Sequence, residues 1–99
     1  MSANNLVTVT NNLFRPLKGG KCTLDVTALR AGNVTIKAYT ANGGLVKTIF
    51  DGPVNAGPLT PAPTWDGRND SGAVVASGLY LVHVSGPGVN KTEKLVLIK

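Results

Sequence analysis

The stretch from Thr64 to Tyr80 constrains the fold of this chain more than any other segment. It begins with a strand signal that ends at Trp65, continues through a loop rich in glycine, aspartate and asparagine, and meets a new strand at Leu79. Residues of this kind hold tight turns, because the short polar side chains bond nearby backbone and glycine tolerates positive φ. The loop contains no nucleophile paired with a base. We therefore expect a turn within a β-sheet protein and no reaction centre.

The rest of the chain alternates between short apolar runs and turn residues. Val, Ile, Leu and Thr recur in the runs, and 12 glycines and 6 prolines separate them. Polar and apolar residues alternate with a period of two in several runs, which marks strands with one buried face. Asn42-Gly43-Gly44 predicts a hairpin turn, Asp51-Gly52-Pro53 should end a strand, and the proline-rich segment Asn55–Pro63 should form an edge strand or a loop. The expected strands are Leu6–Thr10, Lys21–Thr27, Asn33–Thr40, Leu45–Phe50, Thr64–Trp65, Leu79–Ser85 and Lys91–Ile98.

Seven or so short strands joined by turns are typical of an all-β sandwich of the immunoglobulin or fibronectin type III kind. We expect a single domain over residues 1–99, since a chain of 99 residues buries one core. The chain ends at Lys99, directly after a strand. We expect it to be the C-terminal module of a larger protein.

Composition and charge exclude several classes of partner. The formal net charge of +5 comes from ten basic residues that are scattered along the chain, whereas nucleic-acid-binding proteins cluster them and interleave exposed aromatics. We therefore expect no nucleic-acid partner. No apolar run reaches the ~18 residues that a spanning helix requires, so we expect no membrane insertion. Residues 1–5 lack the basic start and apolar stretch of a signal peptide, and any export signal is expected upstream of them.

Several motifs resemble those of a known family of bacterial domains. The most specific are Thr64–Gly72 (TWDGRNDSG), which is nearly identical to the family's Trp-Asp-Gly loop, and Val75–Tyr80 (VASGLY), which matches its Ser-Gly-x-Tyr motif. The other matching segments are Asn11–Pro16, Val34–Phe50, Asn55–Gly57 and Thr92–Lys99. Over essentially its whole length, the chain resembles the immunoglobulin-like domain first named from the flagellar hook-capping protein.

This resemblance implies a seven-stranded β-sandwich with no enzymatic activity of its own. Domains of this family sit at the C-termini of exported bacterial proteins and include type IX secretion sorting domains. The resemblance therefore implies a secreted or cell-surface protein. Its partner would be a protein, either the other domains of its parent or the secretion or surface machinery. The hook-cap scaffold itself is an alternative.

The Trp-Asp-Gly loop offers the best candidates for a metal site. Asp66, Asn69 and Asp70 could supply oxygens to Ca²⁺, which takes about six to eight such ligands. No glutamate closes the loop at a later position. We therefore favour Asx turns, in which these three side chains accept backbone N–H bonds and have a structural role, and we expect neither a metal nor another cofactor.

The remaining residues of the block are also expected to be structural. Gly67, Gly72 and Gly78 should lie at positive φ or at close backbone approaches. Trp65 could stack on a sugar, but a lone tryptophan in a sandwich more often anchors the core. The hydroxyl of Tyr80 should bond a loop backbone group, as in a tyrosine corner.

His83 and Cys22 are the other residues with chemical potential. His83 is the one histidine of the chain, on the predicted face of Leu79 and Leu81, and it has no second histidine as a metal or proton-transfer partner. We expect it to be hydrogen-bonded and structural. Cys22, the one cysteine, should be a buried and inert thiol, with a reactive or linking thiol as the alternative.

We therefore expect a non-catalytic module that acts in surface display, secretion recognition or protein assembly. Edge strands bind added strands through their unpaired N–H and C=O groups, so β-augmentation is the natural mode of contact. Lys91–Lys99 is the first candidate edge, and Leu59–Thr64 is the second. The alternative is a carbohydrate-binding module that uses Trp65 or Tyr39 as its platform.

Overall fold

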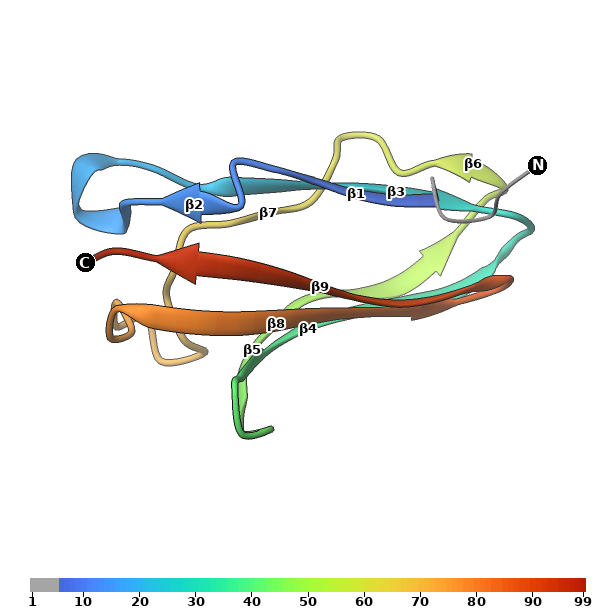
Figure 1. Cartoon of the computed structure of the whole chain (residues 1–99). Helices are drawn as coiled ribbons and strands as arrows, with labels where there is room; N and C mark the ends of the chain where they lie inside the picture. Colours follow the sequence, from blue (N-terminus) through green and yellow to red (C-terminus); the bar gives the residue numbers. More distant parts are fainter. Residues whose placement is uncertain (1–5) are drawn as a thin grey trace.

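The computed structural model describes residues 6–99, which form a sandwich of two β-sheets (Figure 1). In the first sheet, β3 (Cys22–Ala28) pairs with β1 (Val7–Thr10), β6 (Gly57–Pro58) and β7 (Thr64–Trp65). The second sheet has the order β2-β9-β8-β4-β5, formed by β2 (Leu13–Phe14), β9 (Val89–Leu97), β8 (Gly78–Gly86), β4 (Gly32–Thr40) and β5 (Leu45–Val54). A short 3-10 turn, η2 (Pro16–Lys18), follows β2. The predicted all-β sandwich is confirmed.

The strand count differs slightly from the prediction. All seven expected strands are present, and two more, β2 and β6, bring the number within residues 6–99 to nine. Each of the additional strands is two residues long. β6 falls within the segment that was expected to form an edge strand or a loop.

One boundary prediction was wrong. Asp51-Gly52-Pro53 was expected to end a strand, but β5 continues through these residues to Val54. The reason lies in the position of β5, which is the last strand of its sheet. An edge strand tolerates proline, because one side of its backbone has no neighbouring strand to bond.

Period-two alternation decides which faces of the long strands are buried. The inward residues of β3, β4, β8 and β9 pack into one core, while the residues between them face outward. Burying each large aliphatic side chain contributes about 1.5–3 kcal/mol. The inward residues of the three longest buried runs are Cys22, Leu24 and Val26 in β3; Val34, Ile36 and Ala38 in β4; and Tyr80, Val82 and Val84 in β8.

The chain crosses from one sheet to the other near its start. β1 runs antiparallel to β3, and β2 then runs parallel to β9 in the opposite sheet. The crossing takes place at Asn11, whose φ of 61° is unusual for a residue other than glycine. The N–H groups of Val96 and Ile98 donate to the carbonyls of Asn12 and Phe14 at 2.7 and 3.0 Å. These bonds join the beginning of the chain to its last strand.

Two of the sequence-based predictions concern membrane insertion and export. Within residues 6–99, no helix is long and apolar enough to cross a bilayer. Residues 1–5, where the sequence lacks a signal peptide, lie outside the described residues.

Candidate functional site

Trp65 and Tyr80 lie in the core at the two ends of the loop block. The Trp65 side chain is 1% exposed, and its ring meets Phe14 and Tyr80 edge to face at centroid distances of 6.0 and 5.6 Å. Its Nε1–H donates to the carbonyl of Arg68 at 2.9 Å. The Tyr80 hydroxyl donates to the carbonyl of Ala76 at 2.6 Å. Both polar tips therefore hold the loop backbone, and the buried Trp65 ring has no face on which a sugar could stack.

The three oxygen-bearing side chains of the loop do not converge on a common point. The Asp66 carboxylate accepts the N–H of Arg68 and lies 3.6 Å from its Nε. The Asn69 Oδ1 accepts the N–H groups of Ser71 and Ala73, both at 3.0 Å. Within residues 6–99, no group of three or more His, Cys, Asp or Glu side chains is placed to hold a metal ion. Asp66 and Asn69 therefore form Asx turns, whereas Asp70 accepts an N–H from β5.

The glycines of the block have the backbone conformations that the loop requires. Gly67, Gly72 and Gly78 have φ values of 79°, 88° and 155°. Gly67 also lies in a close contact, since a Cβ there would be 2.6 Å from Cγ of Pro16 and 2.8 Å from Cδ1 of Leu97. The start of the Trp-Asp-Gly loop is therefore packed directly against η2 and β9.

His83 and Cys22 belong to different sheets, and only Cys22 lies in the core. His83 is on the outer face of β8, where its Nδ1 is 2.8 Å from Oγ1 of Thr92 on the neighbouring strand. Cys22 is fully buried, and burial raises the pKa of its thiol to about 11. A thiol that stays protonated is a poor nucleophile. Tyr39, the other proposed sugar platform, is half-buried on the outer face of β4.

The loop also closes one edge of the second sheet, which the sequence did not indicate. The N–H of Asp70 donates to the carbonyl of Val46 at 3.2 Å, and Oδ1 of Asp70 accepts the N–H of Thr48 at 3.3 Å. Lys47 Nζ lies 3.7 Å from the same oxygen. Further along β5, Pro53 has no N–H to offer. Natural sheets protect their edges by devices of this kind.

The opposite edge of the sheet is only partly covered. β2 pairs with β9 at Val96 and Leu97 alone. The register between β8 and β9 is uninterrupted, so successive N–H groups of β9 point alternately toward β8 and away from it. The N–H of Thr92 therefore points to the same side as that of Val96, away from β8. The N–H groups of Asn90, Thr92 and Lys94 point to this side, and no strand within residues 6–99 pairs with β9 there. The predicted edge strand is therefore open only over its first half.

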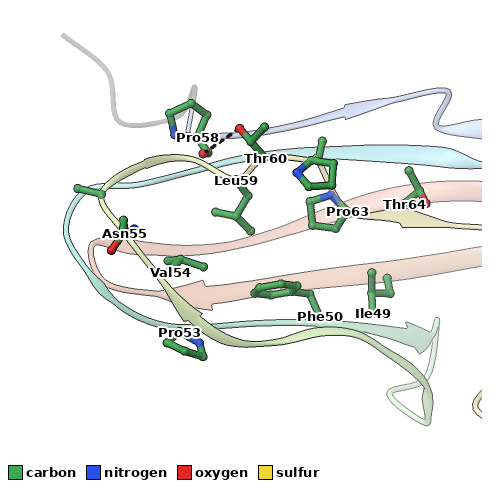
Figure 2. A pocket seen from close by; sticks show the side chains of 13 residues that line it. Ile49, Phe50, Pro53, Val54, Asn55, Pro58, Leu59, Thr60, Pro63 and Thr64 are labelled. Atoms are coloured by element: carbon green, nitrogen blue, oxygen red, sulfur yellow. Dashed lines mark hydrogen bonds between the residues drawn. The ribbon is translucent and has the colours of Figure 1, made fainter.

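An apolar groove runs along the other flank, where β5 faces the segment 55–64 (Figure 2). Its volume is about 660 Å³. Ile49 and Phe50 enter it from β5, and Leu59 points into it from the opposite side. None of its lining residues is charged. Leu59–Thr64, the second candidate edge, therefore borders a groove that was not predicted from the sequence.

The comparison with known families identifies the domain. A model of the FlgD Ig-like domain matches residues 11–88. The chain belongs to this family. No curated protein matches the sequence.

Two solved structures are similar to this FlgD Ig-like domain. One is PorZ, a surface component of the type IX secretion system of Porphyromonas gingivalis, with a TM-score of 0.64 and 23% identity. The match covers 97% of this chain and 12% of that one, and at this identity it supports the fold alone. The other is the alkylpurine DNA glycosylase AlkC of Pseudomonas fluorescens bound to DNA, with a TM-score of 0.48, 17% identity, and coverage of 94% and 29%.

The family match has a boundary that bears on the site. It ends at Gly88, one residue before β9 begins. The FlgD Ig-like pattern therefore includes the Trp-Asp-Gly loop, the edge that Asp70 closes and the apolar groove. The open edge of β9 lies beyond the matched residues.

Proposed function

We propose that this FlgD Ig-like domain is a non-catalytic interaction module of an exported bacterial protein. It acts in surface display, secretion recognition or protein assembly. The observation that carries the proposal is the open side of β9 at Asn90, Thr92 and Lys94, because the unpaired N–H and C=O groups of an edge strand bind an added strand. The match of residues 11–88 to the FlgD Ig-like domain family supports the same class of role.

The polar side chains support a structural rather than a chemical role. The oxygens of Asp66, Asn69 and Asp70 accept bonds from the loop itself or from β5. His83 bonds Thr92 across two adjacent strands. General acid–base chemistry needs a group that is free to meet a substrate at about 2.6–3.2 Å in a suitable pocket. These side chains are instead committed to holding turns and strands.

Charged side chains on the core-facing side of β9 make the open edge selective for certain partner strands. Lys91 and Glu93 lie on the same side of β9 as the buried Leu95, and Lys91 Nζ is 3.2 Å from the Glu93 carboxylate. Inward charges on an edge strand disfavour pairing with indiscriminate apolar strands, because such pairing would remove water from the charges. The partner strand must therefore place polar groups beside this pair.

The proposal is tested by comparing Thr92→Pro with Thr92→Ala in the native host. Both variants lose the hydroxyl that meets His83, but only Thr92→Pro removes the N–H on the open side of β9. Proline is tolerated at such an edge position. We expect Thr92→Pro to lose surface retention of the protein in cell fractionation, while Thr92→Ala retains it.

Circular dichroism and thermal unfolding of the purified 99-residue chain supply the folding control. If both variants are folded and both are retained at the surface like the wild type, strand addition at β9 is wrong. If deletion of the whole domain also leaves export and retention unchanged, the proposed module role is wrong as well.

A further inference from the structure

The outer face of the second sheet, on the side away from the core, carries a cluster of exposed apolar side chains. We call this cluster the outer patch. Its four most exposed members are Leu13, Leu45, Leu79 and Val96, with exposed fractions of 57%, 54%, 42% and 40%. Tyr39 and Leu81 lie half-buried between them.

Strand register makes the outer patch continuous. One row crosses three strands from β2 to β8, and the next row crosses three strands from β8 to β5. The first row is Leu13, Val96 and Leu79, and the second is Leu81, Tyr39 and Leu45. Directly opposed side chains on one face are neighbours, with Cβ atoms about 4.5–5.5 Å apart. The patch therefore extends across all five strands of the sheet.

Such continuity separates the outer patch from ordinary surface hydrophobics. Single exposed apolar residues are normal on any soluble protein, and Leu17 and Leu29 are examples that lie outside the strands. A contiguous apolar patch, in contrast, marks an interaction site. The β4–β5 hairpin also bends away from the sandwich on this side of the sheet (Figure 1). The second row of the patch thus ends on a projecting element, since Tyr39 and Leu45 belong to this hairpin.

The charges beside the patch are positive. Lys94 is in register with Leu81, and Lys37 is in register with His83 in the next row, with both lysines on the outer face. The ion pairs within residues 6–99 engage other cations, and neither Lys37 nor Lys94 has a carboxylate partner there. Two carboxylates lie near these rows, and both are already engaged. Asp51 accepts bonds from Asn33 and Thr35, and Asp70 accepts the N–H of Thr48, the residue in register with Lys37, and lies 3.7 Å from Nζ of Lys47.

We propose that the outer patch binds a partner protein that presents apolar side chains beside carboxylates. Complementary charge favours such a partner and steers its approach. A second copy of this chain carries a net charge of +5 and the same two lysines, so it lacks the complementary carboxylates. A membrane surface is disfavoured because the apolar residues lie within a broad sheet face and do not form an insertable helix. This site uses outward side chains of the sheet, Lys94 and Val96 of β9 among them, and the proposed function uses the backbone edge of the same strand.

The test uses two short peptides of equal length, one alternating Leu with Glu and the other alternating Leu with Lys. Each is titrated into the isotope-labelled 99-residue chain, and binding is followed by NMR. We expect the acidic peptide to shift the methyl signals of Leu79 and Val96 and to bind at least tenfold more tightly than the basic one. The double variant Lys37→Glu/Lys94→Glu should reverse that order. Leu79→Ser should abolish binding, and the matched surface variant Leu17→Ser should not.

Several results would overturn the proposal. Equal affinity for the two peptides, or an unchanged order in the double lysine variant, would show that charge does not select the partner. Shifts that avoid the outer patch would place the binding elsewhere. Sedimentation that shows a dimer lost in Leu79→Ser would assign the patch to a second copy. Binding to phosphatidylglycerol-containing vesicles that is lost in Leu79→Ser would assign it to a membrane.

Discussion

The hydroxyl of Tyr80 offers the sharpest test of how the loop block stabilises the sandwich. It donates to the carbonyl of Ala76 at 2.6 Å, and its ring packs against Trp65 with centroids 5.6 Å apart. Tyr80→Phe removes the hydroxyl oxygen alone and leaves the ring contact in place. Tyr80→Ala removes both. The two variants therefore separate the hydrogen bond from the packing.

The expected losses differ by a clear margin. A net hydrogen bond contributes about 0.5–1.5 kcal/mol, and water can reach the exposed Ala76 once the hydroxyl is removed, so Tyr80→Phe should lower the free energy of unfolding by about 0.5–1.5 kcal/mol. Tyr80 is 6% exposed, and truncating a buried aromatic ring to alanine costs about 3–5 kcal/mol. For a domain of this size, 1 kcal/mol corresponds to about 4–8 °C in Tm.

Urea unfolding measures both variants, with the fluorescence of Trp65, the one tryptophan of the chain, as the signal. The slope m should be unchanged, so that the midpoint alone reports stability. Two outcomes refute the reasoning. If Tyr80→Phe is as stable as the wild type, the hydrogen bond does not hold the loop. If Tyr80→Phe loses as much as Tyr80→Ala, the ring contact does not stabilise the core separately.

Two further predictions concern the buried thiol and the loop glycines. Burial raises the pKa of Cys22 from 9.0 to about 11, so on raising the pH this thiol ionises in the unfolded chain before it ionises in the folded one. Its contribution to the free energy of unfolding is therefore complete below pH 9 and is lost as the pH rises through 11. Between those limits, the free energy of unfolding measured with urea should fall by about 2–3 kcal/mol more for the wild type than for Cys22→Ala. An equal fall in the two proteins would contradict this. Gly67 and Gly72 have φ values of 79° and 88°, so alanine strains the backbone at both by about 1–2 kcal/mol. Gly67→Ala should lower the free energy of unfolding by about 1–3 kcal/mol more than Gly72→Ala, because a Cβ at Gly67 would meet Pro16 at 2.6 Å while one at Gly72 meets nothing within 4 Å. Equal losses of stability in thermal unfolding would be inconsistent with the close contact.

Much of the sandwich could be predicted because alternation is a local property. The buried residues of β3, β4 and β8 follow the period of two that the sequence shows. The continuation of β5 through Pro53 could not be predicted, since only the sheet order places β5 at an edge. β2 was missed for a similar reason. Two residues carry no periodic signal, and their pairing partner, β9, lies at the other end of the chain.

The candidate sites divide in the same way. The bonds from Asn69 to Ser71 and Ala73 span two and four residues, and turn chemistry predicts them. The bond from Asp70 to Thr48 spans 22 residues and depends on where the loop folds back against β5. The outer patch joins residues from position 13 to position 96 through strand register. No window of sequence contains that information.

The parallel pairing of β2 with β9 determines how the domain responds to mechanical tension. When the two ends of the chain are pulled apart, β2 is drawn in one direction and β9 in the opposite one, along their own axes. The bonds from Val96 to Asn12 and from Ile98 to Phe14 are then loaded together in shear and cannot open one after another. A domain tethered at both ends in this geometry resists extension until the bonds between β2 and β9 break together.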